Sequence, residues 1–398
     1  GGGRARGLLT LGQVSLSTVL LVGAGLFVQS LQNALDVDLG FDHDPLINIE
    51  FERQAGVDAD RRDELYREAL AVVNGMPGVE RAILSSSTRP LYGWDEHHEM
   101  RASRIDSIPR VPQGGPYTYA GTEGYVETAG LRVVRGRGFD PSEYATGAPL
   151  ALMVSRSFAE GVWPGLDPLQ ECVYLERDVQ PGEADPCRPV VGVYEDLVVR
   201  SIGDEDLWSV TWPVPLDAPD KRGMLIRVEG DATEMVEPLR ERLTAISSDI
   251  RYVHVIAMTS RVDNMRGPWR VGATVFSVFG LLALLVASLG LYSVLSFSVA
   301  TRSREIGIRS ALGAQRQDLV TMVVARAARL VGAGLIVGLG IAVLAGRFLE
   351  AVLFGVPAVN PVVFGVVAAV LAAADLLAAW LPAWNATGID PVGAMAAE

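Results

Sequence analysis

VFSVFGLLALLVASLGLYSVL, residues 275–295, contains no charged side chain. A helix of about 20 apolar residues is long enough to cross the roughly 30 Å hydrocarbon layer of a bilayer. Three more stretches have the same character: residues 8–31, residues 329–347 between two arginines, and residues 361–384. Only the last has an internal charge, Asp375. The sequence therefore predicts a membrane protein with four spanning helices.

Charged residues are distributed unevenly around these spans. Residues 33–266 contain 41 of the 47 acidic and 24 of the 34 basic residues, a net charge of −17, whereas the rest of the chain carries +4. Arginines precede the first span and fill the link between spans two and three, and basic flanks favour the cytoplasmic side. We therefore expect residues 33–266 to be extracytoplasmic. Their acidic charge also argues against nucleic-acid binding.

The large segment between the first two spans has the pattern of a folded domain. The alternating run LINIEF, residues 46–51, predicts a strand. Asp58 or Asp60 can cap a helix that continues to Asn74, with Gly75 after it. The same strand–helix–strand order recurs over residues 224–257, and the sequence between these two units is rich in short β runs.

We accordingly predict a membrane all-α four-helix transmembrane bundle plus an α+β extracytoplasmic domain, in which a split strand–helix–strand lobe carries a β-rich inserted lobe. The expected divisions are residues 1–32 for the N-terminal tail and first span, 33–266 for the extracytoplasmic domain with its inserted lobe at about 117–195, and 267–398 for the remaining three spans.

Small residues are frequent inside the spans, where they allow helices to approach closely. The glycines in question are Gly23, Gly25, Gly280, Gly290, Gly332, Gly334, Gly338 and Gly340. The alternative, that glycine is simply common in membrane helices, stays open for each of them.

The two cysteines, Cys172 and Cys187, flank a polar turn. Outside the cytoplasm we expect them to form a disulfide, worth about 3 kcal/mol for a loop of this length, and two unpaired thiols are the alternative. The adjacent His97 and His98 lie among acidic residues, but adjacent histidines point apart on a strand. We therefore interpret them as part of a solvated loop and predict no metal site.

Catalytic patterns are absent from the sequence. The only lysine, Lys221, is followed by Arg222, so no G-x-x-x-x-G-K-[ST] phosphate loop exists. A nucleophile elbow and an HExxH motif are also missing. We predict that the chain is not an enzyme and binds no cofactor itself.

The link between spans two and three reads RSREIGIRSALGA, residues 302–314. On its residues alone it could be an amphipathic helix lying on the membrane surface. It also resembles the hallmark of FtsX-like ABC permeases. Other segments match the same family in order, among them VVGVYEDL at residues 190–197 and LFGVPAVNP at residues 353–361. The chain is therefore similar to the MacB/FtsX-like ABC transporter permeases.

The resemblance implies four membrane helices and a MacB-like periplasmic core domain in the inner membrane of a bacterium. It also implies a mechanotransmission mechanism for efflux or export, in which a separate ABC ATPase uses the ATP. The residues expected to couple to that ATPase are Arg302, Arg304, Glu305, Gly307, Arg309 and Gly313. Expected partners are the ATPase, membrane lipid, a periplasmic adaptor or client, and either a second copy of the chain or the other half of a duplicated permease.

Two other functions are compatible with the sequence. One is a signalling permease that regulates a periplasmic or cell-wall partner without moving a substrate. The other is a sensor with an extracytoplasmic ligand-binding domain, but a sensor needs only the two spans that flank its domain. The residues leave open the client, the identity of the ATPase, whether the chain is a fragment, and the role of Asp375.

Overall fold

The computed structural model describes residues 2–53, 57–85, 100–105, 108, 115–148, 150–175, 186–198, 201–203, 208–218, 223–301, 316–350 and 352–386. The chain forms two compact units, residues 1–36 with 266–398, and residues 37–265. The sequence placed the corresponding boundaries after residues 32 and 266. His97 and His98, which we interpreted as part of a loop, lie outside the described residues.

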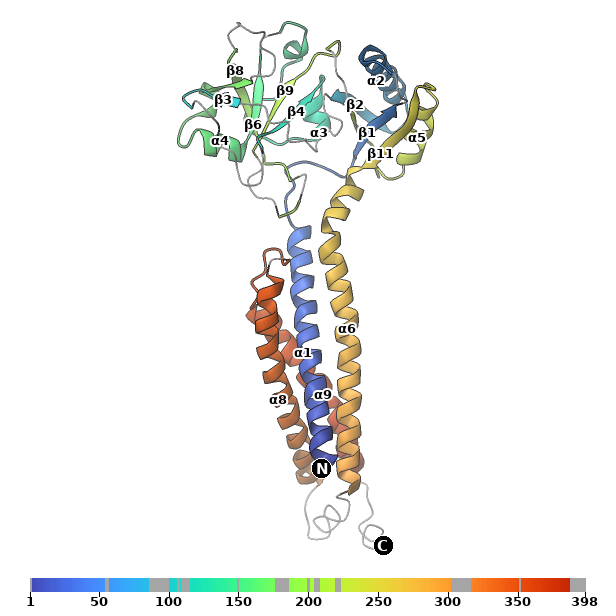
Figure 1. The fold of residues 1–398 in the computed structure, drawn as a ribbon, viewed down its shortest axis with the longest axis vertical. Coiled ribbons are helices and arrows are strands. Elements are labelled where there is room, and N and C mark those ends of the chain that lie inside the picture. Colours follow the sequence, from blue (N-terminus) through green and yellow to red (C-terminus); the bar gives the residue numbers. More distant parts are fainter. Residues whose placement is uncertain are drawn as a thin grey trace. The chain divides into compact units, whose positions relative to one another are not determined.

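The first lobe of the unit 37–265 is a four-stranded antiparallel sheet with two helices (Figure 1). Its elements are β1 (Leu46–Arg53), α2 (Ala59–Asn74), β2 (Val79–Ser85), β10 (Gly223–Val228), α5 (Val236–Thr244) and β11 (Ile250–Ala257). The strands lie in the order β11-β1-β10-β2, so each strand–helix–strand unit leaves a gap that a strand of the other unit fills. This is the predicted split arrangement.

Helix α2 illustrates how local sequence sets the boundaries of an element. The Asp58 carboxylate accepts a hydrogen bond from the backbone N–H of Arg61 at 2.8 Å, which satisfies one of the free N–H groups of the first turn. At the other end, the N–H of Gly75 donates to the carbonyl of Val72. Leu65 and Val73 lie on one face and are fully buried against the sheet. The helix predicted from these residues is confirmed.

The second lobe extends the same sheet in the order β4-β9-β6-β8-β7-β3, with β5 paired to β8. Its elements are β3 (Met100–Ala102), β4 (Tyr117–Gly121), α3 (Tyr125–Ala129), β5 (Val133–Gly136), a 3₁₀ turn (Pro141–Tyr144), β6 (Leu152–Ser155), α4 (Arg156–Val162), a 3₁₀ turn (Pro168–Gln170), β7 (Cys172–Leu175), β8 (Arg188–Tyr194) and β9 (Ser209–Pro213). The lobe thus also includes β3 and β9, which lie outside the range 117–195. Both strands are short, and their pairing is long-range, so their own residues give little sign of it.

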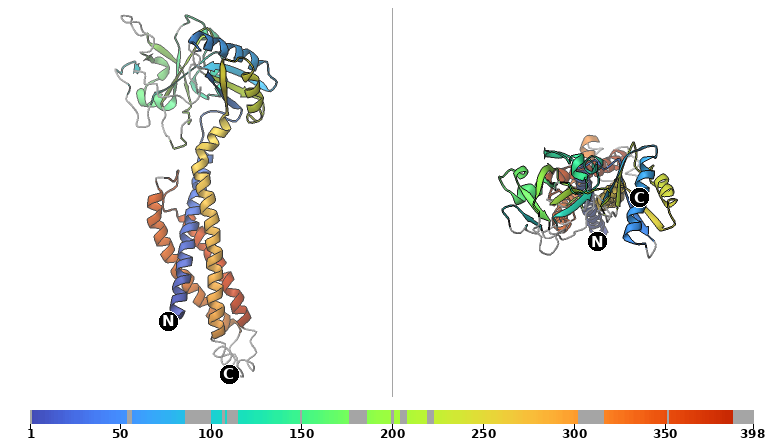
Figure 2. Two further views of the ribbon diagram at one scale, coloured as in Figure 1. Left: turned by 45° about the vertical axis from the view of Figure 1, so that its right-hand side comes forward. Right: turned by 90° about the horizontal axis from the view of Figure 1, so that it is seen from above.

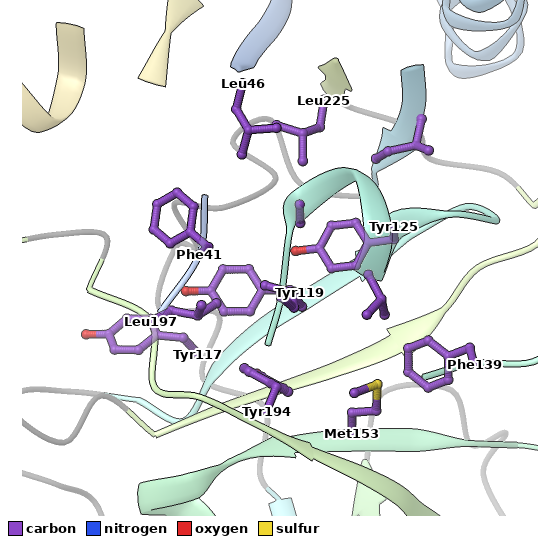
Figure 3. Packing of buried hydrophobic residues seen from close by; sticks show 14 of the residues in the cluster. Phe41, Leu46, Tyr117, Tyr119, Tyr125, Phe139, Met153, Tyr194, Leu197 and Leu225 are labelled. Carbon is purple, nitrogen blue, oxygen red and sulfur yellow. The ribbon is translucent and has the colours of Figure 1, made fainter. Parts of the chain in front are cut away.

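Buried aromatic side chains join the two lobes (Figure 3). Leu46 and Leu225 of the first lobe belong to the same core cluster as Tyr119 and Tyr194 of the second. The Tyr194 hydroxyl bonds the Ser209 hydroxyl at 2.8 Å. Burial raises the pKa of Tyr194 well above its usual value, so this phenol stays neutral. The two lobes therefore share this cluster, while each also has a core cluster of its own.

A disulfide joins Cys172 to Cys187, with 5.6 Å between their Cα atoms. Cys172 begins β7, and Cys187 directly precedes β8. These strands pair antiparallel, with Cys172 opposite Pro189. The bond therefore closes the connection between two neighbouring strands.

Replacing both cysteines with serine is expected to lower the free energy of unfolding of this unit by about 3 kcal/mol, because the unfolded chain regains the freedom of the closed loop. The measurement is chemical unfolding of the purified full chain without reductant. Wild type treated with reductant serves as the control and should match the variant. Equal stability of oxidised wild type and variant would contradict the expectation.

In the part of the chain that the structure describes, the other unit consists of four long helices (Figure 1). They are α1 (Gly2–Leu35), α6 (Met258–Thr301), α8 (Arg316–Leu349) and α9 (Pro361–Ala386). Each contains a segment long and apolar enough to span a membrane: residues 7–35, 258–301, 320–349 and 361–380. The predicted all-α four-helix bundle and α+β domain are confirmed.

Candidate functional site: the membrane-spanning bundle

Helix α1 contacts the three other helices of the bundle. Phe27 of α1 stacks on Phe276 of α6, with ring centroids 5.1 Å apart. The Ser15 hydroxyl donates to the carbonyl of Gly334 in α8 at 2.9 Å. The left view of Figure 2 shows the helices of the bundle running alongside one another. Among the described residues, the interior of the bundle is filled with side chains such as Leu26 and Leu371.

Six of the eight glycines singled out in the sequence lie where another helix leaves no room for a side chain. A Cβ added at Gly338 would lie 2.5 Å from Thr18 Cβ, and one added at Gly25 would lie 2.5 Å from Val363 Cγ1. Close contacts of this kind also occur at Gly23, Gly280, Gly290 and Gly334. Gly332 and Gly340 have no such neighbour within 4 Å. Glycine therefore determines how closely α1 approaches its neighbours.

The contacts also define the direction of each helix. Gly334 and Gly338 of α8 meet Val14 and Thr18 of α1, so these two helices run parallel. Along α6 the order is reversed, since Gly272 meets Phe27 and Gly290 meets Gln13. The start of α1, the start of α8 and the end of α6 therefore share one end of the bundle. We call it the basic end, because Arg4, Arg6, Arg302, Arg304, Arg309 and Arg316 occur in the adjoining sequence.

Polar side chains hold the α8–α9 connection at the opposite end. Asn33 Nδ2 donates to the carbonyl of Gly355 at 2.9 Å, and the N–H of Phe354 donates to the Ser30 hydroxyl at 2.6 Å. Trp269 Nε1 donates to the carbonyl of Val352 at 2.9 Å. Asn360 accepts from the N–H of Val362 at 2.9 Å and so caps α9. These bonds hold the connection against α1 and α6.

Asp375 lies inside α9 and is fully buried. Its Oδ1 atom accepts a hydrogen bond from the Ser288 hydroxyl of α6 at 2.9 Å. Its Oδ2 atom is also buried and has no hydrogen-bond partner among the described residues. A carboxyl group in a membrane span is costly unless it faces other helices. Asp375 faces α6, and this placement avoids the free-energy cost of exposing its carboxyl group to lipid.

The residues predicted to couple to an ATPase, Arg302, Arg304, Glu305, Gly307, Arg309 and Gly313, lie outside the described residues. The structure describes the two helices that flank them, α6 ending at Thr301 and α8 beginning at Arg316. The role of these six residues stays a prediction. Among the described residues, no group of three or more His, Cys, Asp or Glu side chains could hold a metal ion.

Sequence reasoning missed the polar contacts at the end opposite the basic end. Ser30 and Asn33 are three residues apart and share one face of α1. Asn360 directly precedes Pro361, a pairing typical of a helix start. Polar residues on one face of an otherwise apolar span could have indicated these contacts. The partner carbonyls, however, belong to a loop more than 300 residues away.

Fold and bundle together define a class of protein, a multi-pass membrane protein with a large α+β domain inserted between its first and second spans. Residues 277–391 match the family described as FtsX-like permease C-terminal. That range begins within α6 and covers the segment with the charged motif and the last two spans.

Named relatives extend this likeness over more of the chain. The macrolide export ATP-binding/permease protein MacB of Rhodospirillum rubrum is 27% identical over 277 residues, which cover 65% of this chain and 40% of that protein. The uncharacterized ABC transporter permease YknZ of Bacillus subtilis is 26% identical over 341 residues, 82% of this chain and 77% of that protein. The pyoverdine export ATP-binding/permease protein PvdT of Pseudomonas entomophila is 26% identical, covering 67% of this chain and 40% of that protein.

Among solved structures, the periplasmic region of MacB from Actinobacillus actinomycetemcomitans aligns with a TM-score of 0.39 and 13% identity, over 59% of this chain and 98% of that one. The family match and the relatives confirm the resemblance drawn from the motifs: the chain is similar to MacB/FtsX-like ABC permeases. The chain spans 40% of the length of the MacB and PvdT relatives.

Proposed function

We propose that this chain is the permease of an ABC transporter of the mechanotransmission type. In this proposal a separate ATPase binds at the basic end of the bundle and uses ATP. The spanning helices transmit its movement to the domain of residues 37–265, which moves a client for efflux or export. The single observation that carries the proposal is the FtsX-like match over residues 277–391, which includes the charged motif at 302–314.

The length of α6 supports transmission along a helix. Strand β11 ends at Ala257, and α6 begins at Met258 with no loop between them. The helix has 44 residues, which at 1.5 Å per residue is about 66 Å, roughly twice the hydrocarbon thickness. Part of α6 must therefore extend beyond the hydrocarbon. The direct continuation of β11 into α6 gives the chain a route along which a displacement could pass from the spanning helix to the domain.

The packed interior of the bundle supports a mechanism in which the client does not pass between the four helices. Val14, Ala287, Leu371 and Ala379 are all fully buried. Apolar side chains in close contact leave no room for a hydrated client. The client is then handled by the domain of residues 37–265, and the bundle acts as the mechanical link.

Orientation follows from charge and from the disulfide. The arginine-rich end lies in the cytoplasm in this proposal, and residues 37–265 lie outside it. The Cys172–Cys187 bond suits an oxidising compartment. The relatives named ATP-binding/permease proteins combine both functions in one chain. Here a bacterial inner-membrane assembly would pair a separate ATPase with two permease units, either two copies of this chain or two halves of a duplicated permease.

Replacing Glu305 and Arg309 with alanine is the test of the ATPase contact. If the charged motif binds the ATPase, the double variant should retain less than about a tenth of the co-purifying ATPase, since each lost charge-assisted contact costs about 1.5–3 kcal/mol. The measurement is co-purification of an ABC ATPase with the tagged full chain from the cells that naturally produce it.

The matched control replaces Arg347 and Glu350 with alanine. These two residues carry the same pair of charges at the other end of α8. Both side chains are exposed, so this variant should bind the ATPase as wild type does. Unchanged co-purification of the Glu305/Arg309 variant would refute the proposed contact.

A further inference from the structure

A groove of about 650 Å³ lies between α1 and α8 at the basic end of the bundle. It is lined by Gly7, Leu8, Leu11, Arg326, Arg329, Leu330 and Ala333. The four α8 residues are spaced i, i+3, i+4 and i+7, so they form one stripe along the helix. The groove therefore combines two cationic groups with an apolar floor.

The two arginines have no carboxylate partner in the described part of the chain. Both side chains are exposed, and Arg329 Nε donates to the carbonyl of Ala325 in its own helix at 3.3 Å. Many arginines of the unit 37–265 differ in this respect. Arg137, for example, pairs with Glu143 at 2.8 Å. The guanidinium groups of Arg326 and Arg329 are thus available to an external anion.

The depth of the groove matches the headgroup layer of a bilayer. The apolar part of α8 covers residues 320–349, about 45 Å of helix, which exceeds the roughly 30 Å of hydrocarbon. Within it, Arg329 and Arg347 are 18 residues apart, about 27 Å of helix. With Arg347 at one interface, Arg326 and Arg329 therefore lie at the other, where arginine side chains reach phosphates. Leu8, 70% exposed, adds an apolar side chain to the groove, facing the upper part of the acyl chains just below the headgroup layer.

We propose that this groove binds an anionic phospholipid. Its phosphodiester lies between Arg326 and Arg329, and an acyl chain lies along Leu8, Leu11 and Ala333. Basic pockets between membrane helices are suited to anionic headgroups. Gly7 has no side chain and Ala333 has only a methyl group, which leaves the space that the acyl chain occupies. The occupant is a lipid rather than a soluble anion because the groove floor is apolar and the lining side chain of Leu8 is largely exposed.

Binding is measured by native mass spectrometry of the detergent-purified full chain with phosphatidylglycerol or with phosphatidylcholine of identical acyl chains. Wild type should bind phosphatidylglycerol more tightly than phosphatidylcholine. Replacing Arg326 and Arg329 with glutamine should weaken phosphatidylglycerol binding roughly 30-fold, and each single replacement roughly 5-fold. Ala333→Trp, which fills the groove and leaves both charges, should weaken it as well.

Arg347→Gln is the matched control, because it removes one exposed arginine from the other end of α8. It should bind phosphatidylglycerol as wild type does. The proposal is overturned if Arg326→Gln and Arg329→Gln bind like Arg347→Gln, or if phosphatidylcholine binds equally well. Competition by millimolar inorganic phosphate would also overturn it, since the groove would then hold a free anion.

Discussion

Gly338→Leu is expected to disrupt the packing of α1 against α8 and to lower the free energy of unfolding by about 3 kcal/mol or more. A Cβ at this position would lie 2.5 Å from Thr18 Cβ and 2.8 Å from the backbone oxygen of Ser15. The backbone oxygen cannot move unless α1 itself moves. Thr18 is fully buried and its hydroxyl already donates to the carbonyl of Val14, so its side chain has no free space to occupy.

Gly340→Leu provides the control on the same helix. No neighbouring atom lies within 4 Å of a Cβ built at Gly340, and leucine favours a helix over glycine. This variant should be as stable as wild type or slightly more so. Both are measured by denaturant unfolding of the full chain in detergent. Equal destabilisation by the two replacements would show that the close approach at Gly338 is not what holds α1 to α8.

Phe158→Ala is expected to lower the free energy of unfolding of the domain of residues 37–265 by about 3–5 kcal/mol. Phe158 is fully buried in α4. Its ring lies 5.8 Å from that of Trp163 and 5.7 Å from that of Trp208, both edge to face. Removing it leaves a cavity between two indole rings. Trp163 Nε1 donates to the carbonyl of Ser103 at 3.2 Å, which holds one ring in place, so the site can collapse only in part.

Unfolding of the full chain, followed by tryptophan fluorescence, measures this loss. Leu166→Ala serves as the control in the same lobe, since Leu166 is 43% exposed and its replacement should change stability by no more than about 0.5 kcal/mol. A loss for Phe158→Ala no larger than that of the control would mean that the aromatic cluster does not stabilise this lobe.

Local sequence was a reliable guide where an element is defined by its own residues. The cap at Asp58 and the stop at Gly75 predicted α2, and the apolar runs predicted the four spanning helices, because each of these signals acts within a few turns of helix. The family resemblance likewise rested on contiguous motifs. The six residues of the charged motif and their role in ATPase coupling stay a prediction.

Long-range contacts decided the features that sequence reasoning did not find. Asn33 and Gly355 are far apart in the chain and meet only because α1 and the α8–α9 connection end at the same level. Arg326 and Arg329 stand at the start of the third apolar stretch of the sequence, but the groove beside them exists only because Gly7 and Leu11 of α1 lie opposite.

The sequence by itself determined that this chain spans a membrane, that it carries an acidic domain between its first two spans, and that it resembles the MacB/FtsX-like permeases. Hydropathy, charge and contiguous motifs are properties of neighbouring residues, so they can be read along the chain. Only the tertiary structure decided which glycines bring helices together, that Asp375 faces Ser288, and that two arginines share an apolar groove. Those features depend on residues that become neighbours only when the helices pack.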